Sequence, residues 1–123
     1  MTEYLDSMVC DLEKDMSGSI KTFSTPSAAV TPPLRSSADD EITLNEMFCS
    51  YVGRIMFACG ATGPTQSNAC RELTAHLSVS NEEHWMVLKH LMGYIKQGIN
   101  QGIKIFAPKD IQVVAFVDSN YAY

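Results

Sequence analysis

The chain has 123 residues and a formal net charge of −5. Its composition, 46% hydrophobic and 19% charged, is typical of one modest globular domain, and no apolar run approaches the roughly 18 residues that a membrane span needs. The acidic balance opposes broad phosphate binding, because non-specific nucleic-acid affinity comes largely from Lys and Arg, so any nucleic-acid contact must be local.

The start of the chain and its cysteines indicate a reducing environment. The N-terminus has no basic flank that leads into an apolar segment, so it does not resemble a secretory signal. We therefore expect an intracellular protein, cytoplasmic or nuclear, with no membrane partner. The cysteines lack the short Cys-x-x-Cys spacing of zinc sites. We expect free, mostly buried thiols at Cys10, Cys49, Cys59 and Cys70.

Residues 1–16 are predicted to form an amphipathic helix with Thr2 as its N-cap. Its apolar residues recur at helical spacing: Tyr4, Leu5, Met8, Val9 and Leu12. Residues 17–42 are rich in Ser, Thr, Ala and Pro, which indicates a linker with extended or disordered backbone and little to bury. The N-terminal helix is therefore expected to be loosely attached.

Two helices are predicted in the next part of the chain. Thr43 and Glu46 form a capping box, and the helix that follows should end near Gly60. Gly63 and the proline after it reopen the chain. A second helix is expected from about 65 to 78, with its apolar residues on one side.

A third helix is predicted from the capping box formed by Ser80 and Glu83, and Gly98 is its natural end. An apolar stripe runs along it, starting at Trp85. Three consecutive helices with short connections should pack as a small antiparallel bundle.

The last stretch predicts a β-hairpin, with strands over 102–106 and 111–118 and a turn over 107–110. A two-stranded hairpin is marginal alone in water, and an exposed apolar strand invites edge-to-edge association. The predicted fold is therefore mainly α, and α+β overall. Its parts are a helix over 1–16, a linker over 17–42, a three-helix bundle over 43–98 and a hairpin over 99–123.

The apolar run of the second strand delivers one carboxylate, Asp118, close to the end of the sequence. Metal-dependent nucleic-acid chemistry needs several carboxylates that converge to hold two divalent ions about 4 Å apart. No partner carboxylate follows Asp118, so we expect no complete metal site. This pattern is typical of a piece of a larger protein.

Five segments, taken in order, resemble the copia-type LTR retrotransposon polyprotein. They are Tyr51–Phe57, Asn68–Leu73, Glu83–Trp85, Gly93–Lys96 and Phe116–Ala122. The match is similar to the junction where the reverse transcriptase thumb passes through a connection into ribonuclease H, and it covers roughly residues 44–123. Residues 1–26 are similar, more weakly, to the end of the preceding palm.

The resemblance implies a helical thumb that grips the template–primer duplex, an RNA–DNA hybrid or a DNA duplex. The first helix of the bundle is similar to the one that lies against the minor groove. Cys49, Gly53 and Phe57 share one of its faces, where a glycine lets backbone approach sugars and an aromatic ring can pack on them. A second interpretation stays open, in which Gly53 permits close helix packing and Phe57 belongs to the core.

Three cations are candidates for phosphate contacts. Lys89 and Lys96 are seven residues apart and share a face of the third helix, and Arg71 approaches that face if the second helix is its neighbour. Such a stripe could hold two or three phosphates. The alternative is that these side chains are only solvated surface residues.

The sequence departs from the family pattern at two places. Residues 63–67 replace an Arg-Pro-Asp-Ile segment, which removes a basic and an acidic residue. Asn120 stands where the family has a second aspartate, so only Asp118 is carried over, as a vestigial metal-binding carboxylate. The family implies Mg²⁺ for the parent enzyme, but the polymerase aspartates are absent from this chain.

The resemblance therefore predicts a fragment of a reverse transcriptase and ribonuclease H polyprotein without catalysis of its own. Its partners would be a weakly bound duplex and the missing palm and ribonuclease H portions. The alternative function is a domesticated helical module for protein interaction or self-association, which would form a homo-oligomer.

The histidines and cysteines offer no catalytic site by their spacing. His84 and His90 are six residues apart and lie on opposite sides of a helix, so they cannot chelate one ion. We expect His84 to cap or pack in the first turn of its helix and His76 to lie on a helix surface. Cys70, beside Arg71, has no readable base or orienting partner.

Overall fold

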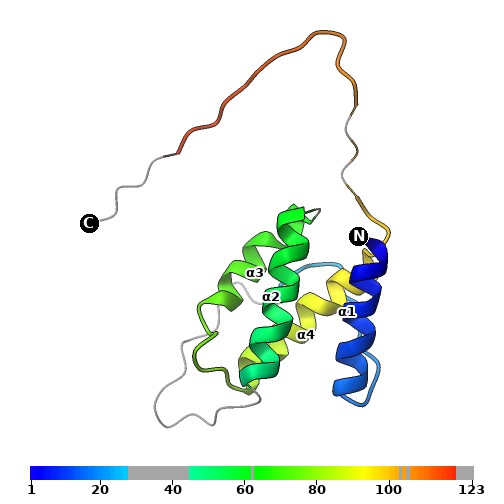
Figure 1. The fold of residues 1–123 in the computed structure, drawn as a ribbon, viewed down its shortest axis with the longest axis vertical. Helices are drawn as coiled ribbons and strands as arrows, with labels where there is room; N and C mark the ends of the chain where they lie inside the picture. Colours follow the sequence, from blue (N-terminus) through cyan, green and yellow to red (C-terminus); the bar gives the residue numbers. More distant parts are fainter. Residues whose placement is uncertain (28–44, 62, 103, 105, 119–123) are drawn as a thin grey trace, which may run out of the picture.

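The computed structural model describes residues 1–27, 45–61, 63–102, 104 and 106–118, and this part of the chain is mainly helical (Figure 1). Its elements are α1 (Thr2–Asp15), α2 (Asn45–Ala61), the 3-10 helix η1 (Pro64–Gln66), α3 (Ser67–Thr74) and α4 (Glu82–Gln97). Helices α2 and α3 pack side by side, and α4 contacts both α3 and α1. None of these helices is long and apolar enough to cross a membrane.

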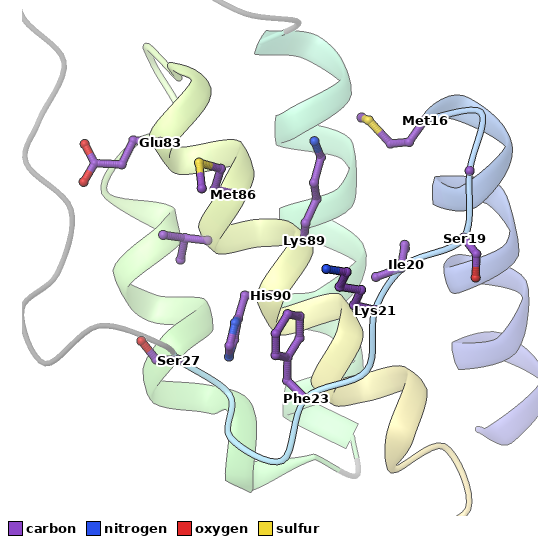
Figure 2. Close-up of a pocket in the computed structure, with 12 residues that line it drawn as sticks. Met16, Ser19, Ile20, Lys21, Phe23, Ser27, Glu83, Met86, Lys89 and His90 are labelled. Carbon is purple, nitrogen blue, oxygen red and sulfur yellow. The ribbon is translucent and has the colours of Figure 1, made fainter.

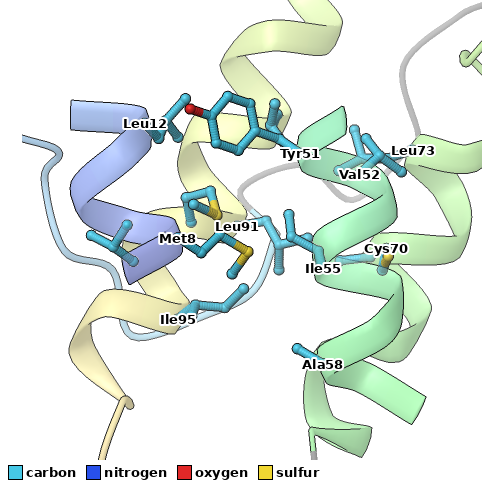
Figure 3. Packing of buried hydrophobic residues seen from close by; sticks show 14 of the residues in the cluster. Met8, Leu12, Tyr51, Val52, Ile55, Ala58, Cys70, Leu73, Leu91 and Ile95 are labelled. Atoms are coloured by element: carbon cyan, nitrogen blue, oxygen red, sulfur yellow. The ribbon is translucent and has the colours of Figure 1, made fainter. Parts of the chain in front are cut away.

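One apolar core joins all four α-helices (Figure 3). Helix α1 contributes Leu5, Met8, Val9 and Leu12 to it. The expectation of a loosely attached N-terminal helix is therefore wrong. The reason is that α1 has a regular apolar stripe, and this stripe is covered by packing against α2 and α4.

The predicted helix limits are confirmed at three ends. Helix α1 covers 2–15 of the predicted 1–16, α2 ends one residue after Gly60, and Gly98 is the C-cap of α4. The N-cap of α1 is Met1 and not Thr2, which already belongs to the helix. Residue 43 and its proposed capping box lie outside the described residues.

The second helix of the predicted bundle is shorter than expected. A 3-10 turn starts it at Pro64, and α3 ends at Thr74 rather than near residue 78. The chain turns there because His76 enters the interior, where its ring stacks on the ring of His84 at a centroid distance of 3.8 Å. His76 is therefore a buried residue and not the surface histidine that was predicted.

The start of α4 is displaced by one residue from the prediction. Asn81 is the N-cap, and its side chain accepts a hydrogen bond from the backbone N–H of His84 at 3.1 Å. The ring Nδ1 of His84 accepts in return from the N–H of Asn81 at 3.1 Å, which completes a capping box. The capping role of His84 is confirmed. Ser80, predicted as the cap, is buried, and its N–H donates to the side chain of Asn45.

The predicted β-hairpin is not shown by the structure. Residues 104 and 106–118 are described, and they contain no strand and are all exposed. Residues 103 and 105, which belong to the first predicted strand, lie outside the described residues. In Figure 1 residues 106–118 form an arc above the bundle, apart from its helices.

Residues 17–27 follow α1 and lie against α4, and we call them the strap (Figure 2). They have no regular secondary structure, but Ile20 packs against the core and Phe23 is only half exposed. The expectation that this linker has little to bury is therefore wrong for the strap. Residues 28–42, the rest of the predicted linker, lie outside the described residues.

Candidate functional site

The predicted duplex face of α2 is exposed at two of its three residues. A Cβ added to Gly53 would meet nothing within 4 Å, and the Phe57 side chain is 62% exposed. The ring of Phe57 contacts the ring of Tyr4 at a centroid distance of 5.4 Å. Among the described residues, Gly53 therefore does not serve close helix packing and Phe57 is not a core residue.

Cys49, the third residue of that face, is engaged inside the protein. Its thiol donates to the backbone oxygen of Leu77 at 3.0 Å, and the side chain of Asn45 donates to the same oxygen at 3.1 Å. These contacts tie the start of α2 to the turn after α3. Cys49 is half-buried and is better explained as part of this link than as a duplex contact.

A cation that the sequence analysis did not single out lies beside Gly53. The guanidinium of Arg54 pairs with Asp11 at 3.0 Å and lies within 6 Å of the ring centres of Tyr4 and Tyr51. The backbone oxygen of Arg54 also accepts from the Tyr4 hydroxyl at 3.3 Å. Arg54 therefore joins α1 to α2 and places one positive charge next to the exposed face. Its position directly after Gly53 was the signal that could have identified it.

Acidic side chains of α1 also meet α2. The hydroxyl of the buried Tyr51 donates to a carboxylate oxygen of Asp15. Burial, followed by this hydrogen bond and the charges of Asp15 and Asp11, raises the pKa of Tyr51 above its ordinary value. Tyr51 therefore stays neutral and acts as a structural donor.

The three predicted phosphate ligands have different surroundings. Lys96 is held by protein groups: it pairs with Glu13 and donates to the backbone oxygen of Ile20 at 3.2 Å. Arg71 is exposed and donates to Asn68 on its own helix at 3.0 Å. Lys89 lines a groove described below. The proposed stripe therefore loses Lys96, which fastens α1 and the strap to α4.

A groove of about 590 Å³ lies between the strap and the first half of α4 (Figure 2). Its apolar lining comes from both sides: Met16, Ile20, Phe23, Met86 and Val87. Lys21 and Lys89 add positive charge, and Glu83 lies toward the start of α4. Pockets of this size and mixed character are the usual form of binding sites. This groove was not predicted, because residues 17–42 were expected to form a linker that packs on nothing.

Gly93 positions the strap. A Cβ at this residue would lie 2.1 Å from the backbone oxygen of Lys21 and 2.7 Å from a ring carbon of Phe23. The N–H of Phe23 donates to the oxygen of Gly93 at 3.4 Å. Only glycine leaves room for this crossing of strap and helix. The sequence signal for this crossing was a glycine inside a strong helical pattern, because a glycine at such a position often serves close packing.

His90 holds the strap one turn earlier on α4. Its ring stacks on Phe23 with a centroid distance of 3.9 Å, and its Nε2 donates to the backbone oxygen of Thr25 at 2.9 Å. The floor of the groove is therefore fixed by an aromatic stack and a hydrogen bond.

The four cysteines are free thiols, as predicted, but they are not mostly buried. Cys10 is exposed, Cys49 and Cys59 are half-buried and Cys70 is buried. A hydrogen bond from Cys70 lowers the pKa of the Cys59 thiol. The same contact, together with burial, holds the pKa of Cys70 above its ordinary value. The pair lies between α2 and α3.

Asp118 is exposed at the last described position. Residue 120, where the sequence lacks the second acid, lies outside the described part. Among the described residues no group of three or more His, Cys, Asp or Glu side chains could hold a metal ion. The structure therefore brings no partner to Asp118 in that part of the chain.

Comparisons with known proteins add no further identification. No protein-family model matches the sequence, and no solved structure matches the chain. The resemblance to the copia-type polyprotein therefore stays a prediction based on the five segments.

Proposed function

We propose that this chain is a non-catalytic segment of a copia-type reverse transcriptase and ribonuclease H polyprotein, comprising thumb and connection. Four of its five resembling segments fall on helices of one bundle, as a thumb requires. These are Tyr51–Phe57 on α2, Asn68–Leu73 on α3, and Glu83–Trp85 with Gly93–Lys96 on α4. The proposal places the protein inside the cell, in the cytoplasm or the nucleus, with the palm and ribonuclease H portions as its partners.

The proposed residual activity is a weak grip on a template–primer duplex by α2. The observation that carries it is the open surface at Gly53 beside the exposed ring of Phe57. A backbone without a side chain can approach the sugars of a minor groove, and an aromatic ring can pack against them. Arg54 lies next to this surface, but its charge is balanced by Asp11, so the proposed grip does not depend on it. The net charge of −5 keeps the affinity low.

No catalytic step is assigned to the chain. The parent family uses Mg²⁺, which needs several converging carboxylates, and the proposal gives this chain only the vestigial carboxylate of Asp118. Polymerase and hybrid-cleavage assays with added Mg²⁺ should give no turnover. Robust turnover that is abolished by Asp118→Ala would contradict the proposal.

Duplex binding is tested by fluorescence anisotropy with an RNA–DNA hybrid over a range of salt concentrations. Gly53→Leu fills the open surface with a side chain that helices accept, and we expect binding to weaken by about tenfold. Arg54→Gln should leave the salt slope nearly unchanged, because its guanidinium is already paired with Asp11. The matched control is Gly102→Leu, which adds the same side chain at another open glycine outside the face. Equal binding by Gly53→Leu and wild type would rule out this face.

A second candidate function is a helical module for protein interaction or self-association. It is favoured by the row of exposed apolar side chains near the C-terminus. Their exposed fractions are Phe106 72%, Ile111 89%, Val113 94%, Val114 66%, Phe116 95% and Val117 89%. Size-exclusion chromatography with light scattering separates the two functions. A stable dimer without salt-dependent hybrid binding favours self-association, and a monomer with a steep salt slope favours the thumb.

A further inference from the structure

We propose that residues 111–118 of one copy of this chain occupy the groove between the strap and α4 of a second copy, which gives a reciprocal dimer. The inference rests on the self-association candidate and names the surface and the partner for it. It is independent of duplex binding by α2, since the groove is built by the strap and α4.

The groove has an apolar lining and enough room to take up further side chains. Ile20 and Phe23 line it from the strap, and Met86 and Val87 line it from α4. Its volume of about 590 Å³ is enough for several apolar side chains. Met86 is 63% exposed, so the groove is open at this side.

Residues 111–118 have the composition of an occupant. In an extended chain successive side chains point to opposite sides, so Ile111, Val113 and Val117 share one apolar side. Val114 and Phe116 lie on the other side, and all five are at least 66% exposed. A segment that is apolar on both sides is suited to lie between two covering surfaces rather than on one face in water.

The charges of the groove and of the segment are complementary. Lys21 and Lys89 lie together in the groove, and Figure 2 shows Glu83 apart from both, nearer the start of α4. The segment carries carboxylates at both ends of its apolar run, Asp110 and Asp118. Lys109 lies next to Asp110 in the sequence, so Asp118 is the carboxylate without an adjacent cation. With the Asp118 end beside Lys21 and Lys89, opposite charges meet at the rim of the contact, which favours association in this direction.

The path of the chain favours a second copy as the source of the segment. Figure 1 shows residues 106–118 in an arc above the bundle, beyond the end of α4, whereas the groove uses the first half of the same helix. Exchange between two copies covers both exposed surfaces at once and forms a closed, symmetric contact.

The experiment uses two variants of the full chain. Met86→Glu places a charge in the groove at an exposed residue, and Phe116→Asp places one in the segment. Wild type should be a dimer by light scattering, and each variant alone should have a dissociation constant at least tenfold higher. Met56→Glu is the matched control, because Met56 is 48% exposed on α2 and outside the groove, and this variant should remain a dimer.

Mixing the two variants tests the exchange directly. The intact segment of Met86→Glu can enter the intact groove of Phe116→Asp, so the mixture should form a one-to-one heterodimer held by one of the two contacts. Differently labelled chains measured by fluorescence transfer report this species. Thermal unfolding of each variant at low concentration verifies that both remain folded.

Three results would overturn the inference, and they have different meanings. If Met86→Glu dimerises like wild type, the segments pair with each other, and self-association stands without the groove. If the mixture stays monomeric while wild type is a dimer, the groove and segment are not partners. If wild type is a monomer at all concentrations, the self-association candidate fails as well.

Discussion

Two segments without regular secondary structure behave in opposite ways. The strap, residues 17–27, is polar and was expected to bury little, but it lies against α4. Residues 106–118, which we call the C-terminal segment, are far more apolar and are exposed throughout. Hydrophobicity of a segment therefore does not decide whether it packs on its own chain. A matching surface and a favourable tether decide it.

The tether differs between the two segments. The strap continues from α1, which is part of the core, so ordering it closes a short connection at a modest entropy cost. Specific contacts then offset that entropy cost. They are the close crossing at Gly93, the stack of Phe23 on His90 and the ion pair of Lys96 with Glu13. The described side chains of the C-terminal segment are all exposed, so no comparable contacts offset the cost of ordering it on its own chain.

The largest expected difference between the two segments is in their rates of cleavage by trypsin. Cleavage after Lys109 requires no opening of the bundle, whereas cleavage after Lys21 requires release of the strap from α4. An opening free energy of about 1.4 kcal/mol would slow cleavage at Lys21 by about tenfold. Mass spectrometry of early time points at low protein concentration gives the order of the cuts. Equal rates at both lysines would show that the strap is not held.

Gly93→Ala should be the most damaging small substitution in the strap contact. The new Cβ would overlap the backbone oxygen of Lys21, and we expect a loss of about 1 to 3 kcal/mol in the free energy of unfolding. Gly53→Ala is the matched control inside another helix, with nothing near its Cβ, and it should stabilise by about 0.5 to 1 kcal/mol. Urea unfolding measures both. A stabilising Gly93→Ala would contradict the close crossing.

The same two segments show how far the sequence could predict this fold. Helical periodicity identified α1, α2 and α4, because an apolar stripe has to be covered wherever it occurs. Periodicity carries no information on the strap, because its position depends on Gly93, a residue of α4 that lies 70 positions after Phe23 in the sequence. The early end of α3 was not predicted for a related reason, since the turn that ends it accompanies the burial of His76 against His84 of α4.

The candidate site, too, could be predicted only where it depends on the spacing of residues within one helix. Helical spacing predicted that Gly53 and Phe57 share one side of α2, but it left open whether that side is exposed or packed, and the structure shows it exposed. The role of Lys96 could not be predicted, since its partner Glu13 lies on a different helix far away in the sequence. The groove was missed because it requires the strap to be in place.

The two segments can be compared by making the same substitution, phenylalanine to alanine, once in each. Phe23→Ala removes the stack on His90 and part of the groove wall, and it should lower the free energy of unfolding by about 1 to 2 kcal/mol. Phe116→Ala removes a ring that is 95% exposed, and it should change the free energy by less than about 0.5 kcal/mol. Both values are measured by urea unfolding at concentrations where the chain is monomeric. A similar loss in both variants would remove the contrast between the segments.

The ion pair that anchors the strap should give the smallest effect, visible as a pH dependence. A hydrogen bond from Lys96, followed by one from the N–H of Ile20, lowers the pKa of Glu13 below its ordinary 4.5. The unfolded chain therefore takes up this proton at a higher pH than the folded chain does. The contribution of Glu13 to stability is complete above about pH 4.5 and is lost as the pH falls through the lowered pKa.

Comparison with Glu13→Gln isolates this contribution in urea unfolding between pH 7 and pH 3. The difference in unfolding free energy between wild type and Glu13→Gln should be constant above pH 4.5 and shrink below it. In a Lys96→Met background the first cause of the lowered pKa is gone, so the same difference should vary much less with pH. If the pH dependence persisted without Lys96, the strap would be anchored by Ile20 and its neighbours, and the ion pair would be incidental to its position.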